Sequence, residues 1–165
     1  MGEVREWRKE DMLAQALDIE GIFRRNADTV YRVCFTYLRA PADAEDVVQQ
    51  VFMKLVANPR TFNDAEHEKA WLITCAVNAC KDVLKSAHRT RSAQMPPDVE
   101  DPAKRDETLD AVLALEDPHR IAVYLHYYEG YKSQEIAQML DANPSTVRNW
   151  ISEAREKLRV MLGGE

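Results

Sequence analysis

The sequence predicts an all-α fold of two small helical domains, a three-helix N-terminal lobe and a four-helix C-terminal lobe with a helix-turn-helix. Apolar residues recur at steps of three and four along the chain, and no segment alternates as a strand would. Residues 94–106, QMPPDVEDPAKRD, break this periodicity with three prolines and four acids, as an extended linker does. We therefore place the lobes at residues 1–92 and 107–165, joined by a flexible acidic linker at 93–106.

The N-terminal lobe is expected to hold helices over residues 12–38, 42–57 and 68–87. The first two end before Pro41 and Pro59, because proline restrains the preceding residue away from helical geometry. Asn63 or Asp64 is suited to cap the third. The apolar residues expected to face inward are Leu17, Ile22, Phe23, Val30, Val33, Cys34, Tyr37, Val47, Val48, Val51, Phe52, Leu55, Val56, Trp71, Leu72, Cys75, Ala76, Ala79 and Val83.

The C-terminal lobe is expected to hold two helices, over residues 107–115 and 118–128, followed by a helix-turn-helix. In the latter, Ser133 is expected to cap a first helix whose inner face is Ile136, Ala137 and Leu140. Asn143 then caps a second helix that begins at Pro144. The apolar stripe of this second helix is Val147, Trp150, Ile151, Ala154 and Leu158.

The opposite face of that second helix carries side chains able to reach base edges and phosphates. They are Ser145, Thr146, Arg148, Asn149, Ser152 and Arg155. The spacing alone leaves two interpretations equally open, a DNA-reading helix and a helical hairpin that only packs on its neighbours.

The composition narrows the class of protein. Hydrophobic residues make up 45% and charged residues 30% of the chain, a globular balance. No apolar run approaches a membrane span of about 20 residues, and the charged N-terminus lacks a signal-peptide core, so we expect no membrane insertion and a cytoplasmic location. Cysteine usage favours buried free thiols over a metal site or disulfide. No catalytic or cofactor-binding motif occurs, so we expect neither an enzyme nor a cofactor.

The net charge of −6 does not exclude a nucleic-acid partner. Residues 94–117 contain eight acids and two bases, which accounts for the whole excess. Residues 78–91 contain four bases and one acid. Because salt screens a charge beyond about 10 Å, the local sign matters more than the total.

Three segments in order give the chain a resemblance to the extracytoplasmic-function group of bacterial sigma-70 family sigma factors, over residues 17–162. PADAEDVVQQVFMKL (41–55) resembles the group's polymerase-core-binding segment, and AWLITCAVNACKDVLKSAHR (70–89) resembles its promoter-melting segment. Residues 127–159 resemble its C-terminal DNA-reading segment. The resemblance implies a sigma factor whose partners are RNA polymerase core, promoter DNA and an anti-sigma regulator, and a chain that is monomeric when free.

The resemblance assigns two surfaces to the N-terminal lobe. An acidic, amide-rich face would bind the clamp coiled coil of the polymerase's largest subunit, although a lone charge run is by default a solvated face. Its residues are Asp43, Glu45, Asp46, Gln49 and Gln50. The outward face of the third helix would hold an unstacked base of the minus-ten element and its phosphates. Its residues are Asn78, Lys81, Asp82, Lys85 and Arg89.

The C-terminal lobe would enter the major groove at the minus-thirty-five element. Here the chain departs from the group's usual pattern. Trp150, Glu153 and Glu156 stand where relatives often carry basic residues, and Asp141 stands in place of glycine. The departures at positions 153 and 156 put acids on a face that meets phosphate, which weakens the expected contact.

Two other classes of protein remain as alternatives. A helix-turn-helix regulator with a helical N-terminal interaction module would form a homodimer and bind a palindrome without polymerase. A helical adaptor would tolerate the loss of Lys81, Lys85 and Arg148. We also expect the linker to let the two lobes move independently, because it holds few large apolar groups.

Overall fold

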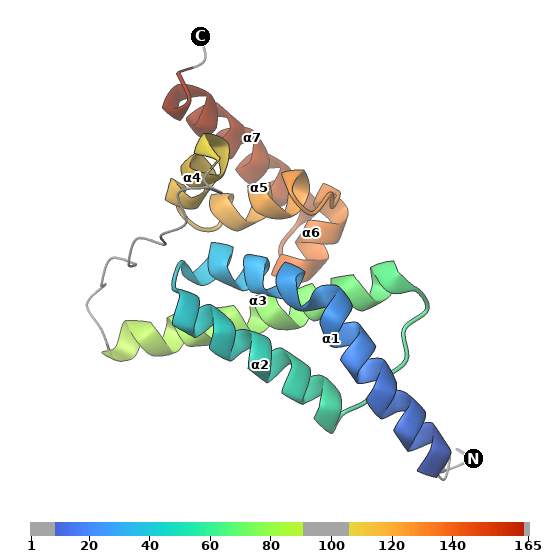
Figure 1. The fold of residues 1–165 in the computed structure, drawn as a ribbon. Coiled ribbons are helices and arrows are strands. Elements are labelled where there is room, and N and C mark those ends of the chain that lie inside the picture. The colour runs from blue at the N-terminus through green and yellow to red at the C-terminus, as the bar shows by residue number, and fades with distance from the viewer. Residues whose placement is uncertain (1–8, 91–105, 164–165) are drawn as a thin grey trace.

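The computed structural model describes residues 9–90 and 106–163, and every regular element in these ranges is an α-helix (Figure 1). The N-terminal lobe holds α1 (Lys9–Leu38), α2 (Pro41–Ala57) and α3 (Ala65–Thr90). The C-terminal lobe holds α4 (Glu107–Ala114), α5 (His119–Tyr127), α6 (Ser133–Leu140) and α7 (Pro144–Met161). The all-α prediction and the number of helices in each lobe are confirmed for the described residues, while residues 93–105 of the predicted linker at 93–106 lie outside them.

Short local signals set the helix ends in the N-terminal lobe. Helix α1 ends where Arg39 adopts a left-handed conformation with φ of 55°. Pro41 then occupies the first turn of α2, where its missing N–H costs no hydrogen bond. Before α3, the Asp64 carboxylate accepts the backbone N–H of His67 at 2.7 Å. Asp64 rather than Asn63 is therefore the cap.

The apolar faces of α1, α2 and α3 pack into one core, as their periodicity predicts. Two residues of the predicted core are instead exposed, since Phe23 is 46% and Val56 is 55% accessible. Phe23 lies at the rim, where its ring meets the ring of Phe52 edge-on at 4.9 Å. Val56 lies in the last turn of α2, one position beyond the buried Leu55.

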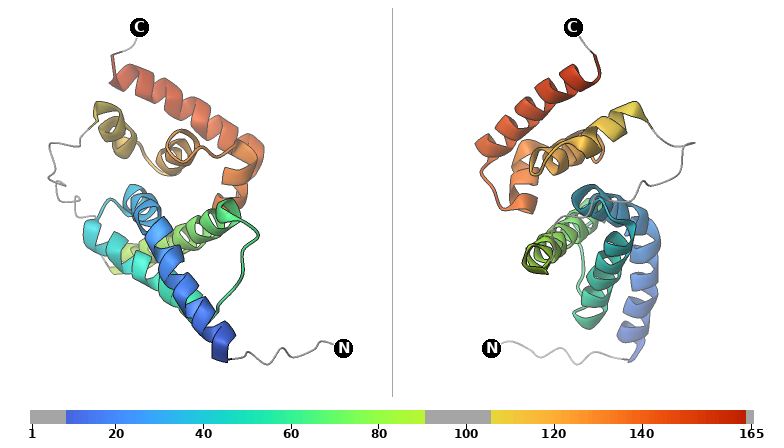
Figure 2. Two further views of the ribbon diagram at one scale, coloured as in Figure 1. Left: turned by 45° about the vertical axis from the view of Figure 1, so that its right-hand side comes forward. Right: turned by 90° about the vertical axis from the view of Figure 1, so that its left-hand side faces the viewer.

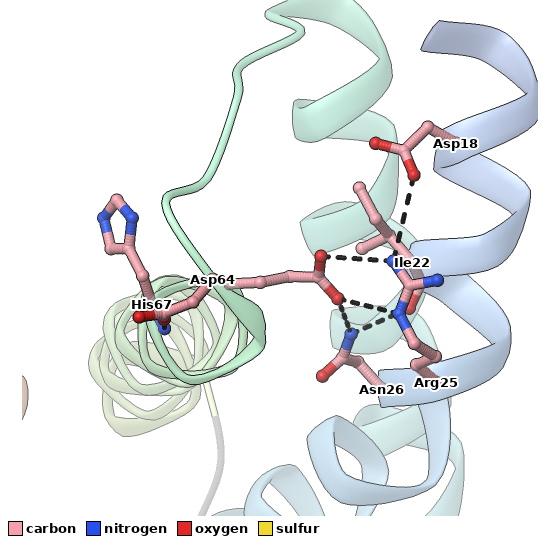
Figure 3. A network of polar contacts seen from close by, with 7 residues as sticks. Asp18, Ile22, Arg25, Asn26, Asp64 and His67 are labelled. Atoms are coloured by element: carbon pink, nitrogen blue, oxygen red, sulfur yellow. Dashed lines mark hydrogen bonds and ion pairs between the residues drawn. The ribbon is translucent and has the colours of Figure 1, made fainter. Parts of the chain in front are cut away.

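A buried polar network also ties α1 to α3 (Figure 3). The Glu68 carboxylate is 8% exposed as a residue and accepts hydrogen bonds from Asn26 Nδ2 at 2.7 Å and from both Arg25 Nε and Nη2. Asn26 Nδ2 also donates to the Ile22 carbonyl. Because a buried carboxylate without partners would be costly, this network selects one register between the two helices.

The C-terminal lobe begins with a capped helix, since the Asp106 carboxylate accepts the N–H of Thr108 at 3.0 Å. The cap predicted at Ser133 is wrong. Lys132 holds the capping position, and its backbone N–H donates to the Glu135 carboxylate at 2.8 Å. Asp141 ends α6 in a left-handed conformation with φ of 55°.

The two lobes are packed against each other. Helix α5 contacts α1 and helix α6 contacts α3, and both views in Figure 2 show the C-terminal helices lying along the N-terminal lobe. The structure shows the lobes in contact, and their independent movement in solution stays a prediction. The contact combines apolar side chains of both lobes, which belong to one buried cluster, with charged and polar groups whose partners are far apart in sequence.

Three further observations concern the described residues as a whole. No helix among them is long and apolar enough to cross a membrane. Within 9–90 and 106–163, no group of His, Cys, Asp and Glu side chains could hold a metal ion. Cys34 and Cys80 are buried free thiols, as expected, and Cys75 is a half-buried one.

Candidate nucleic-acid and protein interfaces

Helix α2 presents a continuous polar face to solvent. Its five predicted core-binding residues are all exposed: Asp43, Glu45, Asp46, Gln49 and Gln50. The inner face is fully occupied by the core through Ala44, Val47, Val51, Phe52 and Leu55. The sequence interpretation missed Met53, which is 70% exposed and lies one turn beyond Gln49 and Gln50. The outer face therefore combines carboxylates, amides and the large apolar side chain of Met53, and Val56 is also exposed near the end of the helix.

Helix α3 presents only part of its predicted DNA-binding face. Asn78, Asp82 and Lys85 are exposed. Lys81 is half-buried instead of exposed, and its Nζ donates to the Leu140 carbonyl of the C-terminal lobe at 2.8 Å. Arg89 lies in the last turn of α3, and its side chain is outside the described part of the structure.

A small aromatic cluster lies where the α2–α3 loop meets α3. The rings of Phe62 and Trp71 lie 5.6 Å apart, and both residues pack partly buried against the core. The Arg60 guanidinium lies over both rings, 4.8 Å from the Trp71 centroid and 5.9 Å from that of Phe62. Trp71 is thus a half-buried residue at the edge of the core, consistent with the core role predicted for it. Arg60 was not singled out in the sequence, where it appears as a lone base after a proline.

Helix α7 has the two faces that its sequence predicts. Val147, Ile151 and Ala154 are buried, while Trp150 and Leu158 pack partly buried against the core. The predicted DNA-reading residues Ser145, Arg148, Asn149, Ser152 and Arg155 are exposed, and Thr146 is half-buried. These side chains stand on the outer face of the second helix of a helix-turn-helix, the position from which such a helix contacts base edges.

The two acids that depart from the family pattern each have a basic partner. Glu153 Oε2 lies 2.6 Å from His119 Nε2 on α5. Glu156 pairs with Arg159 one turn along α7, and the hydrogen bond and charge of Arg159 lower the pKa of that carboxyl. The guanidinium of Arg155 lies 5.7 Å from the Tyr127 ring centroid. The negative charges of Glu153 and Glu156 are thus partly neutralised by basic partners within the C-terminal lobe.

Two family models match the chain over these surfaces. The model described as sigma-70 region 2 matches residues 22–90, and the model described as sigma-70 region 4 matches residues 105–158. The RNA polymerase sigma factor CarQ of Myxococcus xanthus is 32% identical over 154 residues, which cover 87% of this chain and 88% of CarQ. The chain belongs to the sigma-70 family of RNA polymerase sigma factors.

Other relatives of this sigma factor are named as ECF, or extracytoplasmic-function, sigma factors. The ECF RNA polymerase sigma factor SigL of Mycobacterium tuberculosis is 27% identical over 161 residues, covering 90% of this chain and 91% of SigL. A solved structure of the sigma factor RpoE in complex with the anti-sigma factor NepR from Bartonella quintana has the same fold. Its TM-score is 0.71 at 21% identity, over 88% of this chain and 97% of that one.

The family membership settles the class of function. This sigma factor directs promoter-specific transcription initiation together with RNA polymerase, and sigma factors are not themselves enzymes. The α2 and α3 surfaces lie within the region 2 match, and the α7 surface lies within the region 4 match.

Proposed function

We propose that this sigma factor divides initiation among three surfaces, beginning with the outer face of α2 as the docking site for RNA polymerase core. The observation that carries this assignment is the exposure of all five polar residues from Asp43 to Gln50 above a fully buried inner face. Acidic groups there complement basic groups on a partner, and Met53 adds apolar area that gains from burial in an interface. The chain needs none of these side chains for its own core.

The second surface is α3, for which we propose contact with the opened minus-ten element. Lys85 and Asn78 are exposed on one side of the helix. A lysine there neutralises phosphate and releases counterions, while an amide is able to hydrogen-bond the edge of an unstacked base. Lys81 belongs to this surface once its contact with Leu140 is broken. Asp82 and Arg89 complete the proposed set.

The third surface is α7, for which we propose major-groove contact at the minus-thirty-five element. Ser145, Arg148 and Asn149 lie on its first exposed turns and are placed to read bases. Ser152 and Arg155 lie further along the helix and would serve the phosphate backbone. Because Glu153 and Glu156 flank these residues, we expect this lobe alone to bind DNA weakly.

The sigma-factor assignment also leads us to propose a regulator, a cellular location and an oligomeric state for this chain. The structural relative RpoE was solved with an anti-sigma factor, and we propose a regulator of that kind for this chain. We further propose a cytoplasmic protein that is monomeric when free and catalyses no reaction alone. A helix-turn-helix regulator acting as a dimer is disfavoured because the N-terminal lobe matches region 2.

One reconstitution tests the proposed division of labour. The protein is added to purified polymerase core on fragmented genomic DNA, and the 5′ ends of the transcripts are sequenced. We expect a shared motif near minus ten and a second near minus thirty-five. Arg148→Ala should relax the minus-thirty-five motif alone, whereas loss of both motifs together or of neither would contradict the assignment of α7.

A further inference from the structure

Arg155 has no acidic neighbour along its own helix. The positions one turn before and one turn after it on α7, where side chains meet, hold apolar, hydroxyl or basic residues: Ile151, Ser152, Leu158 and Arg159. Arg159, by contrast, forms an ion pair with Glu156 one turn away. The charge of Arg155 is therefore not neutralised by α7, and its side chain is exposed to solvent.

An aromatic ring contacts Arg155 instead. The ring of Tyr127, the last residue of α5, has its centroid 5.7 Å from the Arg155 guanidinium. Attraction between a guanidinium and the face of a ring acts within about 6 Å. Unlike a carboxylate, a ring holds the cation without cancelling its charge. Arg155 thus stays available to an anion while its side chain is held beside α5.

Tyr127 is itself held by its neighbours. Its ring meets the ring of His126 edge-on, with the centroids 4.8 Å apart. His126 Nδ1 lies 2.7 Å from the Tyr131 carbonyl oxygen, and this contact fixes the orientation of the imidazole. Tyr127 is nevertheless 51% exposed. The core of the lobe therefore depends little on this ring, while Arg155 depends on it for a fixed position.

Arg155 lies on the face of α7 that carries the proposed DNA-reading residues. Arg148 and Ser152 precede it by seven and three residues, the spacing of one helix face, and all three are exposed. A long side chain loses rotamer freedom when it binds a phosphate, and one that is already held in place loses less. A guanidinium is also able to stay on a ring while its N–H groups donate to phosphate oxygens.

We propose that Tyr127 is a positioning residue for DNA binding, which holds Arg155 in place to contact a backbone phosphate at the minus-thirty-five element. The proposal rests on the function proposed for α7 above. Tyr127 acts through a phosphate contact, so it strengthens promoter binding without changing which motif is selected. Because the attraction between a cation and a ring is modest at an exposed site, loss of the ring should weaken binding about two- to fivefold.

Binding of the holoenzyme to promoter DNA tests the proposal. The full-length chain is assembled with polymerase core, and its affinity is measured for a double-stranded promoter fragment that it transcribes in the reconstitution above. Tyr127→Ala should weaken binding, and Tyr127→Phe, which keeps the ring, should bind like the parent. A Tyr127→Phe variant as weak as Tyr127→Ala would assign the effect to the hydroxyl group and overturn the proposal.

A double-mutant cycle separates this role from a structural one. Tyr127→Ala should have no further effect in an Arg155→Ala background, because both changes remove the same contact. An equal loss in the two backgrounds would show that Tyr127 acts independently of Arg155. Parent affinity in Arg155→Ala alone would remove Arg155 from the DNA surface, which is a failure of the function proposed for α7 and ends the proposal with it.

Tyr128→Ala is the matched control. Tyr128 is the next residue and is 41% exposed, but its ring stacks on that of Tyr124 with the centroids 5.3 Å apart. Tyr128→Ala should leave the affinity at the parent value. An equal loss in both alanine variants would indicate a general effect of α5 and contradict the pairing of Tyr127 with Arg155.

NMR of the free full-length chain checks the contact itself, without DNA. The Nε–Hε signal of Arg155 is assigned by its absence in Arg155→Ala. The ring current should displace this signal in the parent and in Tyr127→Phe, and Tyr127→Ala should return it toward the position of an ordinary exposed arginine. A signal that Tyr127→Ala does not move would show that the ring and the guanidinium are not in contact.

Discussion

Tyr37 lies at the end of α1, beside the interface between the lobes. Burial and the negative charge of Asp117 raise the pKa of its hydroxyl to about 12, from an ordinary value near 10. The folded chain therefore keeps Tyr37 protonated at pH values where the unfolded chain would ionise it. The stability that comes from this residue is present below pH 10 and is lost as the pH rises toward 12.

Titration of tyrosine absorbance near 295 nm checks this prediction. Subtracting the curve of Tyr37→Phe from that of the parent should isolate one group that ionises about two pH units above a free tyrosine. Asp117→Asn should move that group to lower pH, because the charge that opposes ionisation is gone. A group that titrates near pH 10 in the parent would show that Tyr37 is solvated.

The exposure of individual residues was predictable only where neighbours in sequence decide it. The polar residues of α2 alternate with an apolar stripe, and helical periodicity alone places them outside. Lys81 has the same local pattern, yet it is half-buried because Leu140, 59 residues away, accepts its hydrogen bond. Arg120 likewise looks like a surface base in sequence and is buried by partners 83 and 84 residues away.

At the scale of a helix, α3 presents an exposed lysine, Lys85, on its proposed DNA-binding face. Lys85→Ala should weaken formation of the open promoter complex and lower the slope of binding against salt concentration by about one, as one phosphate contact is lost. Because Lys85 is exposed, its loss should change the free energy of unfolding by about 0.5 kcal/mol or less. An unaltered salt slope in transcription assays would remove Lys85 from the DNA surface.

Helix α6 ends at Asp141, whose backbone conformation lowers the free energy of unfolding. Asp141 adopts a left-handed conformation with φ of 55°, which glycine adopts without the steric penalty of a Cβ atom. Asp141→Gly should therefore raise the free energy of unfolding, by about 0.5 kcal/mol once the extra freedom of glycine in the unfolded chain is deducted. Urea denaturation checks this prediction. The control is Asp43→Gly, which places glycine at an exposed helical position of α2 and should lower the free energy of unfolding. A destabilised Asp141→Gly would indicate that the carboxylate contributes contacts of its own.

Helix type and number followed from the sequence because each helix carries its own apolar period and end signals. Helix boundaries followed less closely, since α1 and α3 both extend beyond the predicted ranges. The cap of α6 was assigned to Ser133 on residue preference, but Glu135 supplies the carboxylate that accepts the backbone N–H of Lys132. A contact of this kind depends on side-chain geometry that preference scales omit.

For the whole molecule, the family segments and their order identify the class of protein from the sequence alone. The arrangement of the lobes could not be predicted in the same way. It includes apolar packing between the lobes and the contacts of Arg120, Lys69 and Lys81 with groups on distant elements. The prediction of independent lobes rested on the composition of the linker, which carries no information on these contacts.

The measurement that tests the central claim most directly is binding of polymerase core by Asp46→Arg. Asp46 is exposed on α2, away from the buried Val47 and Val51, so the variant should keep its helical content and its stability within about 0.5 kcal/mol. Like-charge contact with a basic partner surface costs several kcal/mol. We therefore expect the unmodified chain to bind core and Asp46→Arg to lose both core binding and promoter-specific transcription. Equal binding of core by Asp46→Arg and the parent would contradict the assignment of α2 as the docking surface.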